Sequence, residues 1–187
     1  MMRRFLVAFA VVAMSACANA TSPLGPGSTG SPEPSPSPGT TPVDTLRVDL
    51  VEAGLRAVLP SDGGRELLFI RSELCETTFT SNREKCEGTL SEEEQAMLAD
   101  RLQGAADQIR FVSSYEEIDD GQAPIDHPGH VFAWVGLAEL QGDGTYWVEA
   151  GETCGGLCGH GGTYVLEPKV DGWVSAGTAP GTGSWIS

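Results

Sequence analysis

The chain has 187 residues, a length that predicts one folded domain together with shorter accessory segments. Its 26 Asp and Glu against 11 Lys and Arg give a formal charge of −15 at neutral pH. A surface this acidic repels phosphate backbones, so nucleic-acid binding is excluded as a class of function. Hydrophobic residues make up 40% of the chain, which is enough to build one core.

The first sixteen residues have the pattern of an export signal. Arg3 and Arg4 precede the apolar run FLVAFAVVAMSA, which is too short to cross a bilayer comfortably. The stretch 14–17, MSAC, resembles the lipobox of bacterial lipoproteins, in which the cysteine is acylated. We therefore expect residues 1–16 to be a lipoprotein signal peptide and Cys17 to carry a lipid anchor that includes palmitate. The alternative is cleavage after Ala20, which would make the protein secreted.

The next segment differs sharply in composition from the rest of the chain. After Cys17, residues 18–42 are rich in Pro, Ser, Gly and Thr and contain one charged residue, Glu33. Such a segment cannot bury enough apolar surface to offset its ordering entropy. We expect residues 17–42 to be the lipidated cysteine and a disordered tether, and residues 43–187 to form a single domain on the extracytoplasmic face of the cell membrane.

Two segments in the first half of that domain have helical periodicity. Residues 44–59, DTLRVDLVEAGLRAVL, form a wide apolar stripe that Asp44 or Thr45 can cap and Pro60 can end. Residues 91–104, SEEEQAMLADRLQG, begin with a capping box of Ser91 and Glu94 and close at a glycine. Both segments are predicted helices.

The remaining segments favour strands. Residues 65–73 and 109–113 predict short strands, and residues 130–140 alternate, with Val131, Ala133, Val135 and Leu137 on one face and Phe132 and Trp134 opposite. The turn 141–144 then leads to a returning strand over 145–151, which completes a first hairpin. A second hairpin is predicted from a strand over 162–168, a turn over 169–172 and a strand over 173–177. The expected fold class is α+β: N-terminal helices followed by a C-terminal antiparallel sheet of two hairpins, stapled by disulfides.

The C-terminal third resembles a bacterial family of exported, functionally uncharacterised domains. The residues that carry this resemblance are a CGGLCG-type turn, a Tyr-x-Leu strand, a Gly-Trp turn and a terminal Trp-Ile-Ser: Cys154, Gly155, Gly156, Leu157, Cys158, Gly159, Tyr164, Leu166, Gly172, Trp173, Trp185, Ile186 and Ser187. The resemblance fades upstream: members of the family tend to have Ser-Arg before a Val-Gly pair, whereas this chain has Ala133 and Trp134 before Val135 and Gly136. The resemblance implies an extracytoplasmic α+β domain and implies no activity.

Four cysteines remain once Cys17 is lipidated or removed. An even number in an exported domain predicts two disulfides, because the compartment is oxidising. We expect nearest-neighbour pairing, Cys75–Cys86 and Cys154–Cys158, although crossed pairings such as Cys75–Cys154 remain open. The glycines of CGGLCGHGG allow the backbone conformations that a short cystine loop requires. A redox dithiol is disfavoured because three residues separate Cys154 from Cys158 and a strand, not a helix, is expected to follow.

A metal site is the competing interpretation of the histidines. Cys154, Cys158 and His160, with His127 and His130 of DHPGH, offer ligands that zinc accepts, but their spacing is not that of a common structural zinc site. The acidic stretch 113–121 lacks the register of a calcium loop. No nucleophile elbow or phosphate-binding loop occurs in the sequence.

These observations predict a membrane-anchored lipoprotein domain that binds a protein or a small molecule without catalysis. No catalytic, cofactor-binding or metal-binding residue is assigned in this interpretation. The alternative is an extracytoplasmic zinc enzyme that uses His127, His130 and His160. The four tryptophans are interpreted as anchors of the core, with an exposed pair as an alternative binding surface.

Overall fold

The structure is a computed structural model that describes residues 43–59, 64–76, 85–118, 127–154 and 158–186. All of these residues belong to one compact unit, residues 41–187. The predicted signal peptide, Cys17 and the tether lie outside the described residues. Among the described helices, none is long and apolar enough to cross a membrane.

The two described helices form where the sequence predicts them. Helix α1 (Thr45–Val58) is capped by Asp44, whose carboxylate accepts a hydrogen bond from the Arg47 amide, and its apolar stripe is buried. Helix α2 (Glu92–Arg101) begins with the complete capping box: the Glu94 amide donates to the Ser91 hydroxyl, and the Ser91 amide donates to the Glu94 carboxylate. Local capping chemistry therefore sets both helix starts.

The described part of the chain contains one large sheet of eight strands. Six of them follow the order β10-β8-β7-β5-β1-β4, while β6 pairs with β7 and β9 pairs with β8. The strands are β1 (Leu67–Arg71), β4 (Gln108–Val112), β5 (His130–Val135), β6 (Glu139–Leu140), β7 (Tyr146–Thr153), β8 (Gly159–Lys169), β9 (Gly172–Thr178) and β10 (Ser184–Ile186).

The expectation of an antiparallel sheet made of two C-terminal hairpins was wrong in part. The predicted hairpins exist, since β7 pairs antiparallel with β5 and β6, and β9 pairs antiparallel with β8. However, β1 is inserted between β4 and β5 and runs parallel to both, so the sheet is mixed. The fold is mixed α/β, with both described helices in the N-terminal half of the 43–187 domain.

A second, two-stranded sheet was also not predicted. Strands β2 (Glu73–Glu76) and β3 (Lys85–Thr89) pair antiparallel, whereas the sequence patterns predicted no strand over residues 74–89. The Cys75–Cys86 disulfide joins facing positions of these two strands, with their Cα atoms 3.9 Å apart. A short pair of strands is marginal alone, so a covalent link across it is a reasonable source of stability.

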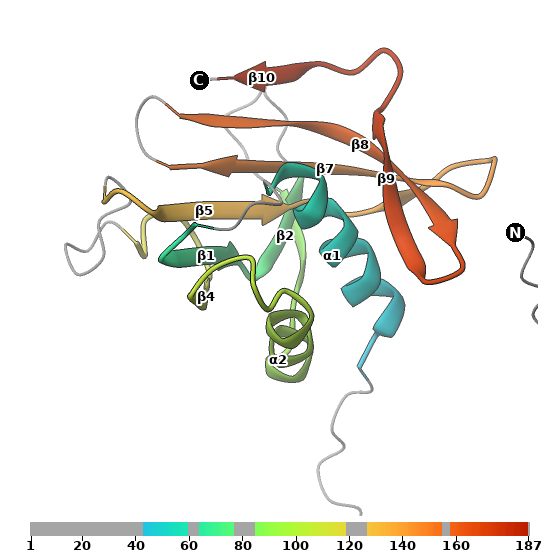
Figure 1. Cartoon of the computed structure of the whole chain (residues 1–187). Helices are drawn as coiled ribbons and strands as arrows, with labels where there is room; N and C mark the ends of the chain where they lie inside the picture. Colours follow the sequence, from blue (N-terminus) through green and yellow to red (C-terminus); the bar gives the residue numbers. More distant parts are fainter. Residues whose placement is uncertain (1–42, 60–63, 77–84, 119–126, 155–157, 187) are drawn as a thin grey trace, which may run out of the picture. The chain divides into compact units, whose positions relative to one another are not determined.

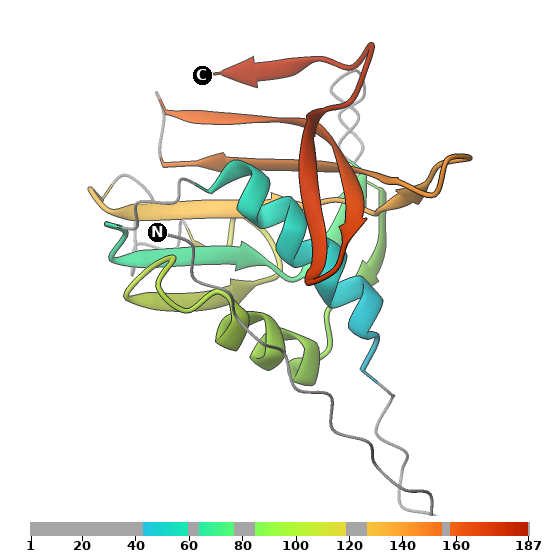
Figure 2. The ribbon, with the colours of Figure 1, turned by 45° about the vertical axis from the view of Figure 1, so that its right-hand side comes forward.

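The two faces of the large sheet carry separate apolar clusters. Helix α1 crosses one face and is flanked by the β8–β9 hairpin, as both ribbon views show (Figures 1 and 2). The main core lies here and includes Leu55, Val135 and Val148. A smaller cluster on β1, β4 and β5 lies on the opposite face, around Phe69 and Phe132. The predicted alternation of residues 131–137 is confirmed by this division.

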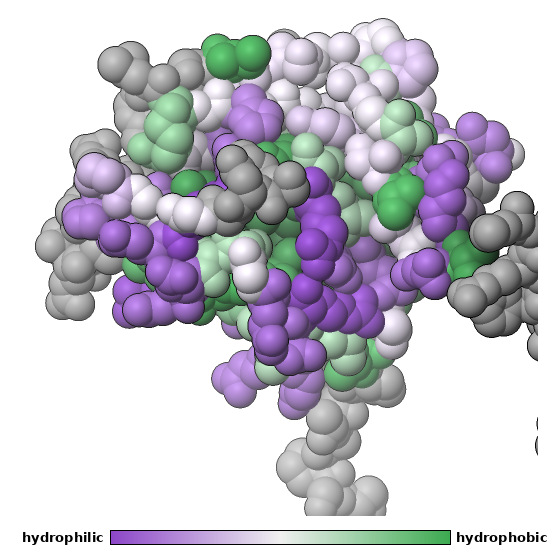
Figure 3. Space-filling view, viewed as in Figure 1, coloured by the Kyte–Doolittle hydropathy of each residue, from purple (hydrophilic) through white to green (hydrophobic). Residues whose placement is uncertain are grey.

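The charged side chains of the helices form ion pairs over the main core. Arg101 of α2 pairs with Asp49 and Glu52 of α1, and Arg56 pairs with Glu52 one turn away. Figure 3 shows hydrophilic side chains gathered over the region of α1 and α2, with paler surface over β8 to β10. The helices thus present a polar outer surface and an apolar inner one.

Candidate functional site

The loop that is richest in unusual residues closes the β7–β8 hairpin. Cys154 and Cys158 are joined by a disulfide, and the Cys154 amide donates to the Cys158 carbonyl at 3.0 Å. Strand β8 starts at Gly159, so no helix follows the second cysteine to lower a thiol pKa. Residues 155–157 lie outside the described ranges. With both sulfurs bonded to each other, neither thiol is available to a metal.

The three histidines separate into two places. His127 and His130 lie together beside Glu66, and one potential ligand atom from each of the three lies within 4.8 Å of the others. His160 is not a member of that group; its Nδ1 lies 3.5 Å from Oε1 of Glu152. Of the three histidines of the predicted zinc site, the structure therefore brings only His127 and His130 together, and the third potential ligand beside them is Glu66.

A second cluster of charged residues surrounds Glu152, on the face of the sheet that α1 covers. Oε2 of Glu152 lies 3.6 Å from Nη2 of Arg65, and both side chains are almost fully buried. Burial raises the pKa of Glu152, and the opposing charges of Arg65 and His160 only partly offset that effect. Burial also raises the pKa of Tyr164, with a further contribution from the Glu152 charge. Nothing in the sequence pattern connects residue 65 with residue 152.

Two tryptophans stack on the opposite face. Trp134 of β5 and Trp185 of β10 lie with ring centroids 5.7 Å apart and planes only 8° from parallel. The strands between them place Gly151 and Gly161 in the same cross-strand row. Both rings are half-buried, and Trp134 also stacks on Phe132. The expected role of the tryptophans as core anchors thus holds only in part for this pair, which lies at the edge of the smaller cluster.

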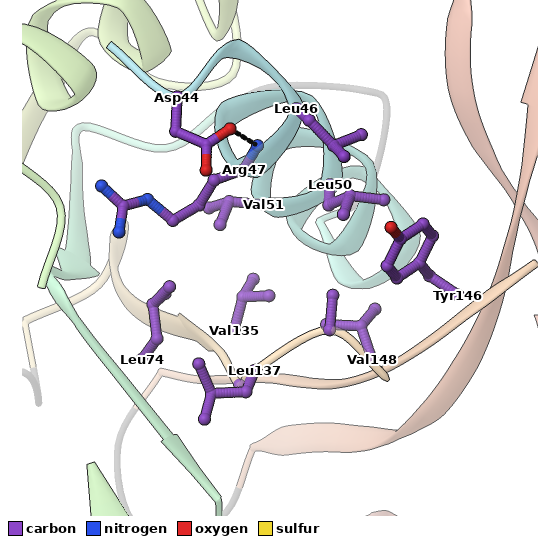
Figure 4. A pocket seen from close by; sticks show the side chains of 12 residues that line it. Asp44, Leu46, Arg47, Leu50, Val51, Leu74, Val135, Leu137, Tyr146 and Val148 are labelled. Atoms are coloured by element: carbon purple, nitrogen blue, oxygen red, sulfur yellow. Dashed lines mark hydrogen bonds between the residues drawn. The ribbon is translucent and has the colours of Figure 1, made fainter. Parts of the chain in front are cut away.

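A cavity of about 210 Å³ lies between the N-terminal half of α1 and the sheet. Its walls are mainly apolar: Leu46, Leu50 and Val51 come from α1, while Val135, Leu137 and Val148 come from β5, the following turn and β7. Figure 4 shows Leu50 and Val51 facing the valines of the sheet, with Tyr146 at one side and Leu74 at the other.

The two charged residues beside this cavity already have structural partners. Asp44 caps α1, and Arg47 donates to Glu94 of α2 through Nε and Nη2. Figure 4 shows the Arg47 guanidinium pointing away from the apolar side chains. Glu94 is 1% exposed, and burial acts to raise its pKa. The hydrogen bonds from Arg47 and from the amides of Ser91 and Asp44 outweigh burial and lower that pKa. The cavity therefore offers apolar contact and no free charge from this pair.

The sequence did not indicate the cavity. Periodicity assigned its apolar residues of α1, with Val135 and Leu137, to buried faces, but periodicity does not show where packing between a helix and a sheet is incomplete. Gly136, which lines it, has no room for a larger side chain, because a Cβ there would lie 3.0 Å from the Cys75 carbonyl oxygen. That constraint is visible only once β2 and β5 are placed side by side.

Comparison with known proteins adds no assignment. No family model matches the chain, and no curated protein and no solved structure is significantly similar to it. The class of protein is therefore defined by the fold alone: a disulfide-bonded, mixed α/β domain with an apolar cavity beneath its first helix.

Proposed function

We propose that this protein is a membrane-anchored lipoprotein of the extracytoplasmic face, whose domain binds a small apolar ligand, or an apolar side chain of a partner, in the cavity under α1. The single observation that carries the binding function is the chemistry of that cavity: mainly apolar walls, and adjacent charges already committed to a helix cap and an ion pair. Pockets that bind small molecules are typically concave and mostly apolar.

The size of the cavity restricts the ligand. An apolar cavity of roughly 150 Å³ accommodates benzene and stays free of water, so about 210 Å³ suits one aromatic ring with a short substituent or a short branched chain. Tyr146 adds an aromatic wall, and its ring packs edge-to-face on Trp173 at 5.2 Å. A hydrophobic group of this size gains roughly 25 cal/mol for each Å² of apolar surface that it buries.

The anchoring function rests on the N-terminal sequence. The positively charged start, the short apolar run and the cysteine of MSAC support export and acylation of Cys17, and the Pro/Ser-rich segment supports a tether between the lipid and the domain. The two disulfides agree with an oxidising compartment outside the cytoplasm.

Binding can be tested with benzene as the probe. The Cys17→Ser chain, kept free of detergent, would be titrated with benzene while the methyl resonances of Val135 and Val148 are followed by NMR. We expect saturable shifts in the wild-type cavity and their loss in Ala138→Phe, which adds bulk to the lining. Leu140→Phe is the matched control, because Leu140 is 65% exposed and does not line the cavity. Equal shifts in all three chains would contradict the proposal.

The anchor has a separate test. The wild-type protein is expected in the membrane fraction, and Cys17→Ser is expected in the soluble extracytoplasmic fraction. A Cys17→Ser protein that stays with the membrane would show that the lipid on this cysteine is not the anchor. Metabolic labelling with a fatty acid then distinguishes lipidation from cleavage after Ala20, since only the lipidated chain incorporates label.

A further inference from the structure

The side chains of Glu66, His127 and His130 lie together at one end of the two parallel central strands. Glu66 directly precedes β1, His130 is the first residue of β5, and His127 belongs to the turn before it. The backbone fixes this arrangement, because the amides of Glu66 and Leu67 both donate to the Gly129 carbonyl, at 2.9 and 3.3 Å. The three side chains therefore come from two segments that are hydrogen-bonded to each other.

Gly129 makes this close approach possible. Its φ of +91° is a conformation that residues with a side chain rarely adopt, and a Cβ there would lie 3.2 Å from Cγ of Glu66. A larger residue in this turn would push the Glu66 side chain away from the histidines. The glycine of DHPGH thus positions the cluster, although it contributes no ligand itself.

The distances within the cluster are close to those of a metal site. The rings of His127 and His130 have centroids 4.4 Å apart, and Nδ1 of His127 lies 3.8 Å from Oε2 of Glu66. In a tetrahedral zinc site with bonds of about 2.0–2.2 Å, the ligand atoms lie about 3.3–3.6 Å apart. Here all three candidate atoms lie within 4.8 Å, so a small rotation of exposed side chains is sufficient to close the site.

The surroundings of the two imidazoles restrict how each ring is placed. Nδ1 of His127, the nitrogen that faces Glu66, also lies 2.8 Å from the Pro128 carbonyl oxygen, so a metal ion bound to Nδ1 takes the place of a proton shared with that oxygen. The His130 ring packs edge-on against Phe69 at 6.1 Å, which limits its rotation.

We propose that Glu66, His127 and His130 form a surface site for a divalent first-row transition metal ion, with Zn²⁺ as the ion that tests it. Two imidazoles and one carboxylate are a ligand set that zinc accepts, whereas Ca²⁺ and Mg²⁺ require oxygen ligands. The carboxylate and His127 are 64% and 52% exposed, so at least one coordination position faces solvent. A site with three protein ligands and an open position is exchangeable and can bind a further group from a ligand or partner.

The acidic chain assists this site without defining it. A net charge of −15 raises the local concentration of cations, and hard cations associate loosely with such surfaces. The two histidines provide selectivity for zinc over those ions. The second such group among the described residues, Glu73 with Cys75 and Cys86, has both sulfurs in a disulfide and is a weaker candidate.

The test is a zinc titration of the full chain, purified in detergent without a polyhistidine tag, by calorimetry and by the visible absorption bands of substituted Co²⁺. We expect one ion per chain. His127→Ala and Glu66→Gln should weaken binding by more than the roughly 10- to 100-fold that follows loss of an outer-shell partner. Both residues are exposed, so these variants should keep the fold.

His160→Ala is the matched control, because His160 lies outside the cluster beside Glu152. It should bind zinc as the wild type does and show the same Co²⁺ spectrum. An equal loss of zinc affinity in His160→Ala and His127→Ala, or full zinc binding by both variants, would overturn the proposal. Either result would indicate that zinc binds adventitiously to the acidic surface. The result is independent of the cavity, since none of the three proposed ligands lines it.

Discussion

Trp134 and Trp185 stack face to face although the strands that carry them, β5 and β10, are not neighbours. Strands β7 and β8 lie between them and contribute Gly151 and Gly161 to the same row across the sheet. The two indoles therefore lean toward each other over two residues without side chains. The glycines are required by this packing, and no turn is involved.

Adding a methyl group to this row is expected to separate the rings. A Cβ at Gly161 would lie 2.7 Å from the Ala150 carbonyl oxygen and 2.8 Å from Nε1 of Trp185, and backbone cannot move as easily as a side chain. We expect Gly161→Ala to lower the free energy of unfolding by about 1–3 kcal/mol. Near-ultraviolet circular dichroism should show loss of the coupled tryptophan signal.

The control for this substitution is Gly183→Ala, where a Cβ would meet nothing within 4 Å. It should change neither stability nor the tryptophan signal by much. A Gly161→Ala protein with wild-type stability and an intact coupled signal would show that the row is less tightly packed than the distances indicate.

Arg47 and Glu94 link the two helices by an interaction in which the partners differ in exposure. Glu94 is 1% exposed, while Arg47 is 34% exposed. Removing the arginine leaves a buried carboxylate without its main partner, which typically costs about 3–5 kcal/mol. Removing the charge of the carboxylate leaves an arginine that water can still solvate, so Glu94→Gln should cost about 1.5–3 kcal/mol. Urea unfolding of Arg47→Ala and Glu94→Gln at neutral pH tests this order.

The reverse order would indicate that the capping box of α2, which Glu94→Gln also weakens, contributes more than the ion pair. Leu46→Ala in the first turn of α1 is a suitable comparison, because Leu46 is 42% exposed, lines the edge of the cavity and makes no ion pair. The change in the free energy of unfolding of this variant measures the effect of shortening a side chain at this end of the helix without breaking an ion pair.

The two disulfides are expected to contribute unequally to the free energy of unfolding. Cys75 and Cys86 are separated by 11 positions and Cys154 and Cys158 by 4, so the first bridge restricts the unfolded chain more. The loop-entropy relation assigns about 3 kcal/mol to the first and about 2 kcal/mol to the second. The double variants Cys75→Ala/Cys86→Ala and Cys154→Ala/Cys158→Ala should therefore melt in that order, the first at the lower temperature.

Intact mass of the unreduced protein provides the accompanying check. Two bridges lower the mass by four hydrogens relative to the reduced chain. Four free thiols among the residues after Cys17 would contradict both bridges, and equal melting of the two double variants would contradict the entropic ranking.

The parts of the fold that were predicted correctly depend on neighbours in the sequence. Both helix starts follow from caps within three residues, and the alternation of residues 131–137 assigns each side chain to its correct cluster. The hairpin from β8 to β9 follows from its turn residues. In each case the determining contacts lie a few positions apart.

The parts that were missed depend on contacts between distant segments. Strand β1 pairs with β4 and β5, each far along the chain, and a strand pattern does not specify its neighbours. One signal was available: Leu68, Phe69 and Ile70 are consecutive apolar residues, and a strand covered on both faces is typical of the parallel part of a sheet. The pairing of Glu66 with His127 and of Arg65 with Glu152 follows from this missed topology.

The raised pKa of Glu152 predicts a pH dependence with a definite sign. Burial favours the protonated acid, so between the ordinary glutamate pKa near 4.5 and the raised value the folded protein holds more protons than the unfolded chain. Stability attributable to this residue therefore falls as pH rises through that window and is constant above it. Glu152→Gln does not titrate there, so the stability of wild type minus that of the variant should decrease with rising pH and then level off.

For Glu94→Gln, we expect the stability difference between wild type and variant to change with pH in the opposite direction. The pKa of Glu94 is lowered because its hydrogen bonds outweigh burial, so its contribution is present above about 4.5 and is lost as pH falls. The wild-type-minus-variant difference should rise with pH for residue 94 and fall for residue 152. A difference for Glu152 that is flat or rises across the acid range would mean that Arg65 and His160 stabilise the carboxylate more than its burial destabilises it.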